Sequence, residues 1–262
     1  WKHLDRLYRS IESVLFEVRS SPPPLVIRNH PSSLNIPSLN LWNASIVGAA
    51  SKQVWIMGGY GCGPTDSEKL PSAKRSSHLY KLSQDTRHGP WAFERTVCAG
   101  RHGENCDESD ILEVSNKKQE SNSTTRLRVH WWKEGTSPDL QGMASCRWTE
   151  SISLFWGGRR SPSDASDALL VLDTNSCRIG TIQDIRGDLP QPRWGHQLIA
   201  LDGNRAVLLG GCNQEDGTFD DIFVLHYCAQ EEKCESNNND KNVPKLGYFY
   251  WERLSIRLPT PR

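Results

Sequence analysis

The 262-residue chain lacks most of the features that mark a membrane protein or a nucleic-acid-binding protein. No apolar run approaches the roughly 18–20 residues of a membrane-spanning helix, so we expect a soluble protein without a membrane partner. Net charge is also missing, because 31 Lys and Arg balance 31 Asp and Glu. This balance excludes a global attraction to nucleic acid, although it leaves room for a local basic patch.

Familiar catalytic motifs are missing as well. The chain contains no GxSxG sequence, P-loop, HExxH sequence or Rossmann glycine pattern. Cys228 and Cys234 lie near His226, but their spacing is irregular and no second ligand pair exists, which argues against zinc. We therefore assign no catalytic, cofactor-binding or metal-binding residue to this chain.

The eight cysteines include no CxxC pair. Their even number and the formal glycosylation sequons at Asn43 and Asn122 would suit an extracellular disulfide framework. We favour reduced thiols and an intracellular, cytoplasmic location, because the cysteines occupy unrelated strand and turn positions. The chain begins at Trp1 with neither an initiator Met nor a signal peptide, so we expect a piece of a longer protein.

What the chain does contain is an apolar strand followed by two glycines, three times over. A polar loop and a second apolar run follow each pair, and in the last two copies this run begins twelve residues after the first glycine (157 to 169 and 210 to 222). Strands with Trp at 91–94 and 250–252 close two of the units. Such repeats are typical of kelch-type β-propeller blades. The paired glycines are Gly58, Gly59, Gly157, Gly158, Gly210 and Gly211.

The pattern predicts three segments. Apolar residues at helical spacing over 3–18 indicate a helix in residues 1–20, either the end of a preceding domain, which we favour, or a strap packed against the propeller. Residues 21–40 form a Pro-rich connector. Residues 41–262 form an all-β, kelch-type propeller segment, with first-blade strands near 43–48, 53–58, 78–83 and 91–97.

The propeller segment is expected to be partial, with about four blades. The first two diglycines lie 99 residues apart and the last two 53, so a blade without a diglycine is predicted between the first two. Its outer strands would lie at 111–114 and 128–132, but 98–110 is too short for two inner strands. The sequence Leu-Pro-x-Pro-Arg occurs at 189–193 and again at 258–262, which predicts that the natural protein continues beyond Arg262.

Most of the recurring residues have a structural explanation. Glycine permits close backbone approach and positive φ near the propeller axis. Arg193 is expected to bond a neighbouring turn and His196 a backbone group. Arg159 and Arg160 follow a diglycine directly and are the candidate contact residues for RNA or another partner, although we favour a solvated turn as their explanation. Trp131 and Trp132 are expected to pack between blades rather than stack on bases.

Several segments together resemble one family. They are Gly-Gly-Tyr-Gly at 58–61, Met-Ala-Ser-Cys-Arg-Trp at 143–148, Phe-Trp-Gly-Gly-Arg-Arg-Ser-Pro at 155–162, and Pro-Arg-Trp-Gly-His at 192–196. Over residues 41–262 the chain is similar to the kelch region of tRNA wybutosine-synthesizing protein 4, also called leucine carboxyl methyltransferase 2. The short second blade departs from that family.

The resemblance implies the propeller part of a transferase that uses S-adenosylmethionine to methylate and methoxycarbonylate a modified guanosine of phenylalanine tRNA. Residues 1–20 would be the final helix of the methyltransferase domain, the cofactor would bind outside this segment, and tRNA would be the partner. The alternative is a non-enzymatic kelch adaptor with a protein partner, such as the substrate receptor of a ubiquitin ligase or a cytoskeletal scaffold. An upstream Rossmann-like glycine loop would favour the transferase, and an upstream F-box or BTB segment would favour the adaptor.

Overall fold

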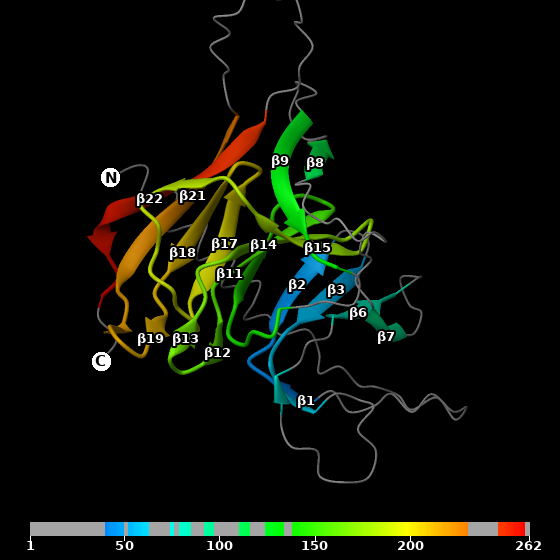
Figure 1. The fold of residues 1–262 in the computed structure, drawn as a ribbon, viewed down its shortest axis with the longest axis horizontal. Coiled ribbons are helices and arrows are strands. Elements are labelled where there is room, and N and C mark those ends of the chain that lie inside the picture. The colour runs from blue at the N-terminus through cyan, green and yellow to red at the C-terminus, as the bar shows by residue number, and fades with distance from the viewer. Residues whose placement is uncertain are drawn as a thin grey trace, which may run out of the picture. The chain divides into compact units, whose positions relative to one another are not determined.

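A computed structural model describes residues 40–49, 52–62, 74–75, 79–84, 92–96, 110–115, 124–133, 138–229 and 246–259 (Figure 1). All regular secondary structure in these ranges is β-strand, which confirms the all-β prediction for them. The predicted helix over 3–18 and nearly all of the connector lie outside them. Within the described ranges, no helix is long and apolar enough to cross a membrane.

Three four-stranded antiparallel blades form the body of the structure, each with its strands paired in chain order. The first blade is a separate four-stranded sheet, and the second and third blades are parts of one eleven-stranded sheet. The first blade comprises β2 (Ser45–Ala49), β3 (Gln53–Met57), β6 (Leu79–Ser83) and β7 (Ala92–Thr96). The second comprises β10 (Ala144–Arg147), β11 (Ile152–Trp156), β14 (Leu169–Asp173) and β15 (Arg178–Ile182). The third comprises β17 (Gln197–Asp202), β18 (Arg205–Leu209), β21 (Asp221–Ala229) and β22 (Gly247–Arg257).

Apolar side chains between adjacent blades form the core. One cluster joins the first and second blades through Trp55, Met57, Met143 and Phe155. A larger cluster joins the second and third blades, where Trp156 meets Trp251 edge to face at 5.8 Å between ring centroids. Every residue of β11 is buried, as expected for a strand covered on both faces. The closing Trp of the third blade is therefore a core residue, as its position in the repeat predicted.

The predicted incomplete blade takes a different form. Its strands β8 (Asp110–Ser115) and β9 (Thr124–Trp131) pair as an antiparallel hairpin, and β9 then adds to the outer edge of β15 in the second blade. Gly180 of β15 admits this strand, because a Cβ there would collide with Val129. The first blade contacts the second blade directly through Ser45, whose hydroxyl donates to the carbonyl of Met143 at 2.6 Å. Strands lie near both expected positions, but the prediction that they are the outer strands of a separate blade was wrong: β9 extends the second blade and also pairs in parallel with β22 of the third.

Short strands follow the diglycines in all three blades. In the first blade, β4 (Tyr60–Cys62) pairs with both β1 (Asn40–Trp42) and β5 (Lys74–Arg75). The second blade has the hairpin of β12 (Arg159–Ser161) and β13 (Asp164–Ala165), and the third has that of β19 (Cys212–Asn213) and β20 (Gly217–Thr218). One further strand, β16 (Ile185–Gly187), pairs in parallel with β22.

Candidate functional site

Three residues in the left-handed backbone region lie at equivalent points of the three blades. Asn43, Gly142 and Gly195 have φ angles of 60°, 70° and 68°. The amide of Gly142 donates to the carbonyl of Asn43 at 2.8 Å, and the amide of Gly195 donates to the carbonyl of Gly142 at 3.0 Å. Each residue turns the chain into the first strand of its blade. These hydrogen bonds therefore hold the starts of three blades together in one row.

The residue before each turn lies 16 positions ahead of the first glycine of its blade (42 to 58, 141 to 157 and 194 to 210). Each pairs across strands with the residue that directly follows the diglycine. The pairs are Trp42 with Tyr60, Gln141 with Arg159, and Trp194 with Cys212. Because cross-strand partners project to the same side, each blade presents one such pair beside the row of turns. We call these six residues the lead-in face.

The diglycines set the distance between blades. All six glycines have φ between 60° and 96°, which confirms the predicted need for positive φ. A Cβ on Gly157 would lie 2.6 Å from the carbonyl oxygen of Arg193, at the start of the next blade. The amide of Gly158 donates to that same oxygen at 2.9 Å. Gly59 bonds Leu140 in the same way between the first and second blades, at 3.0 Å.

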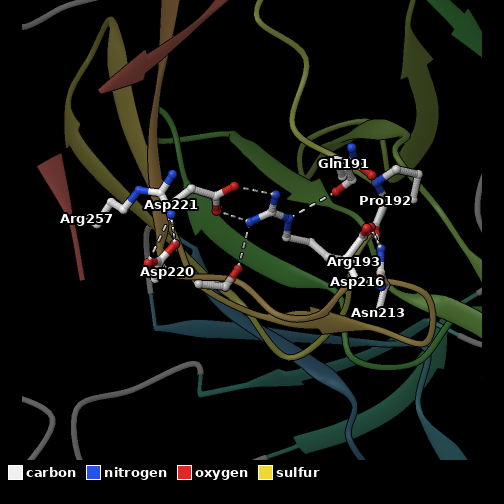
Figure 2. Close-up of polar contacts among 9 residues, drawn as sticks. Gln191, Pro192, Arg193, Asn213, Asp216, Asp220, Asp221 and Arg257 are labelled. Atoms are coloured by element: carbon white, nitrogen blue, oxygen red, sulfur yellow. Dashed lines mark hydrogen bonds and ion pairs between the residues drawn. The ribbon is translucent and has the colours of Figure 1, made fainter. Parts of the chain in front are cut away.

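Arg193 directly precedes Trp194 of the third pair, and its side chain reaches Asp221 (Figure 2). Its side chain is fully buried, and both terminal nitrogens donate to the carboxylate of Asp221. It also donates to the carbonyls of Gly210 and Gln191, at 3.1 Å and 3.0 Å. The predicted bond to a neighbouring turn is thus confirmed, but the carboxylate partner was not anticipated. Trp194 is held in turn by two 3.0 Å backbone bonds to Cys212.

His196 lies between the second and third blades. Its Nε2 is 3.1 Å from the carbonyl oxygen of Trp156, and its ring meets the Trp156 ring edge to face. Burial, together with the nearby positive charge of Arg193, lowers the pKa of His196 to about 3. The imidazole is therefore neutral at pH 7. The predicted backbone partner is confirmed, and its role is to join two blades.

The two candidate arginines differ in their surroundings. The guanidinium of Arg159 lies over the ring of Trp194, with 4.3 Å between the guanidinium carbon and the ring centroid. Arg160 forms an exposed ion pair with Asp164 at 3.8 Å. Only Arg159 therefore belongs to the lead-in face. Neither stacking on Trp194 nor the strand pairing with Gln141 was evident from the sequence.

The lead-in face exposes aromatic surface and leaves polar atoms unbonded. Trp42 is 64% exposed and Tyr60 39%. Nε of Arg159 and Oε1 of Gln141 are buried, and neither has a hydrogen-bond partner among the described residues. Buried polar groups are normally paired, so this cross-strand pair has unused bonding capacity. The sequence could have indicated the face through the constant 16-residue spacing, which aligns Trp42 with Trp194.

Other side chains considered from the sequence lie elsewhere. Trp131 is buried and Trp132 is half-buried, with its indole N–H donating to Thr181 at 2.9 Å, so both pack as predicted. Within the described ranges, no three His, Cys, Asp or Glu side chains are placed to hold a metal. The cysteines found free there are Cys146, Cys177, Cys212 and Cys228.

No protein-family model matches the chain. It is 30% identical over 112 residues to an adagio-like protein 2 and 28% identical over 148 residues to Adagio-like protein 3, both of Oryza sativa subsp. japonica. It is 27% identical over 177 residues to Adagio protein 3 of Arabidopsis thaliana. These alignments cover 41%, 53% and 64% of the chain but only 17%, 23% and 27% of the relatives.

A solved structure of YjhT aligns with a TM-score of 0.40 at 9% identity, covering 80% of this chain and 45% of that one. Compared with the curated Adagio relatives, the chain spans less than a third of their length.

Proposed function

We propose that this chain is a non-enzymatic kelch-propeller module that binds a protein partner through the lead-in face. The observation that carries the proposal is the exposed aromatic pair of Trp42 and Tyr60 beside the stacked Arg159 and Trp194. Trp, Tyr and Arg are the residues most enriched at the energetic centres of protein interfaces. In a longer protein, the module would supply substrate or partner recognition, as in the adaptor alternative drawn from the sequence.

The face is also organised before any partner arrives. Hydrogen bonds between Asn43, Gly142 and Gly195 link its three pairs, and the buried Arg193 fixes the backbone beside Trp194. A rigid surface loses little conformational entropy on binding, which favours affinity. The relatives named Adagio support the adaptor alternative more than the tRNA alternative, since their names mention neither tRNA nor methyl transfer.

The tRNA-modifying alternative remains the second candidate because two adjacent arginines follow the second diglycine. Under it, Arg159 and Arg160 would contact phosphates, and S-adenosylmethionine would bind elsewhere in the longer protein. Arg160 is already paired with Asp164, which reduces the positive charge available for RNA. We expect the chain by itself to bind no S-adenosylmethionine in calorimetry and to transfer no methyl group.

Affinity purification of the tagged chain from cell extract, followed by quantitative mass spectrometry, tests the proposal. The double variant Trp42→Ala with Tyr60→Ala should lose the specifically enriched proteins. Tyr250→Ala is the matched control, because Tyr250 is also 39% exposed but lies on β22, away from the lead-in face. Equal enrichment by both variants, or tRNA as the main bound species with Arg159 and Arg160 required, would refute the proposed function.

A further inference from the structure

The Arg159 guanidinium is held in place by its own backbone and by an aromatic ring. Its backbone is fixed by two hydrogen bonds with Gln141, at 2.9 Å and 3.0 Å, and its side chain stacks on Trp194. Among the described residues, no carboxylate or carbonyl accepts a hydrogen bond from this side chain. Arg186 in the short strand β16 also stacks on a ring, that of Tyr248. It differs from Arg159 because it donates to both carboxylate oxygens of Asp184, each at 2.8 Å.

We infer that Arg159, oriented by Trp194, is a receptor for one carboxylate of a protein partner. Stacking fixes the guanidinium plane and leaves its N–H edge for a planar, two-oxygen acceptor. The indole ring also covers one side of the cation and excludes water from it, which strengthens an ion pair formed there. This inference rests on the proposed function and adds the chemistry of the partner: an acidic side chain flanked by apolar residues.

The charges around Arg159 favour a carboxylate over RNA. The other members of the lead-in face are neutral, namely Trp42, Tyr60, Gln141, Trp194 and Cys212, and Arg160 is paired with Asp164. RNA binding gains affinity from many phosphate contacts made together, and Arg159 is the one charged member of the lead-in face. One guanidinium beside exposed aromatic rings instead matches an acidic residue within an apolar peptide segment.

Selection from a phage-displayed library of random twelve-residue peptides provides the test. The full chain is the bait, and peptides are kept if the Trp42→Ala, Tyr60→Ala variant no longer binds them. We expect a Glu or Asp at one fixed position. Replacing that Glu by Gln in the synthetic peptide should weaken binding by roughly ten- to a hundredfold, the range for hydrogen bonds between charged groups.

Protein variants separate recognition from stability. Arg159→Ala should bind the Glu and Gln peptides equally. Arg159→Lys keeps the positive charge but lacks the planar guanidinium, so it should recover only part of the preference for Glu over Gln. Arg178→Ala is the matched control. Arg178 stacks on Trp131 at 4.2 Å, almost the same distance, but lies in the second blade away from the face. That variant should keep the full Glu preference, and thermal melting should show that all variants remain folded.

The outcomes distinguish the two proposals. Peptides that need Trp42 and Tyr60 but carry no preferred carboxylate would overturn the carboxylate receptor and leave the proposed function standing. A library without any peptide dependent on the face would count against both. Binding of purified tRNA that is lost in Arg159→Ala would also overturn the inference, in favour of a phosphate contact.

Discussion

Arg193 and Asp221 form a buried ion pair that ties the segment leading into the third blade to its third strand (Figure 2). Two aromatic rings lie against the guanidinium, those of Phe219 at 3.8 Å and Phe223 at 5.6 Å. The residue before Asp221, Asp220, pairs with Arg257, whose side chain is 64% exposed. One chain thus contains a buried and an exposed Arg–Asp pair at adjacent positions.

Removal of Asp221 should cost far more stability than removal of its neighbour. Asp221→Ala leaves a buried cation without its partner, and we expect a loss of about 3–5 kcal/mol of unfolding free energy. Asp220→Ala breaks an exposed pair and should cost at most about 1 kcal/mol. Chemical denaturation of both variants checks the difference. Similar midpoints would show that Arg193 finds other partners.

The second glycine of a pair should tolerate no side chain. In Gly158→Val, the new Cβ would lie 2.5 Å from Met143, at a φ of 88°, so we expect a loss of a few kcal/mol. Gly48→Ala is the control, because nothing lies within 4 Å of a Cβ at that exposed position. Thermal melting compares the two. A parent-like melt for Gly158→Val would contradict the proposed tight approach between Gly158 and Met143.

His196 should make stability fall in acid. Its pKa is about 3 in the folded chain, against a usual value near 6.5, so between these pH values the unfolded chain binds more protons. Stability should therefore be lost as the pH falls from 6.5 towards 3, with no further contribution from His196 below that. The slope of unfolding free energy against pH should be smaller in His196→Asn. It should be unchanged in His130→Asn, which alters an exposed side chain. Denaturation midpoints across this pH range measure the slope, and equal slopes in the parent and His196→Asn would exclude the assigned role.

Cys146 should resist thiol reagents while the chain is folded. Burial raises the pKa of its thiol to about 12, so almost none is present as the reactive thiolate. Cys228 is half-buried and should be alkylated first. Timed iodoacetamide labelling with peptide mass spectrometry distinguishes the two sites. Rapid modification of Cys146 under native conditions would mean that the interface between the second and third blades opens readily.

The repeat could be recognised in the sequence because short stretches of residues specify its turns and strands. Paired glycines after an apolar strand specify positive φ at a fixed place, and the apolar runs that follow specify neighbouring strands of the same blade. The strands of the first blade were therefore placed to within two residues. Arg193 and His196 could be assigned structural roles for the same reason, since each stands at a fixed position in the repeat.

Only the tertiary structure decided which residues meet across blades. Arg159 and Trp194 lie 35 positions apart and touch because two blades pack side by side. The pairing of β9 with β15, and the direct contact between the first and second blades, likewise depend on which free strand edge lies nearest once the blades assemble. Contacts of this kind form between segments that are far apart in the sequence, so no local sequence pattern predicts them. The sequence by itself therefore determined the blades and their glycine turns, and packing between blades created the lead-in face.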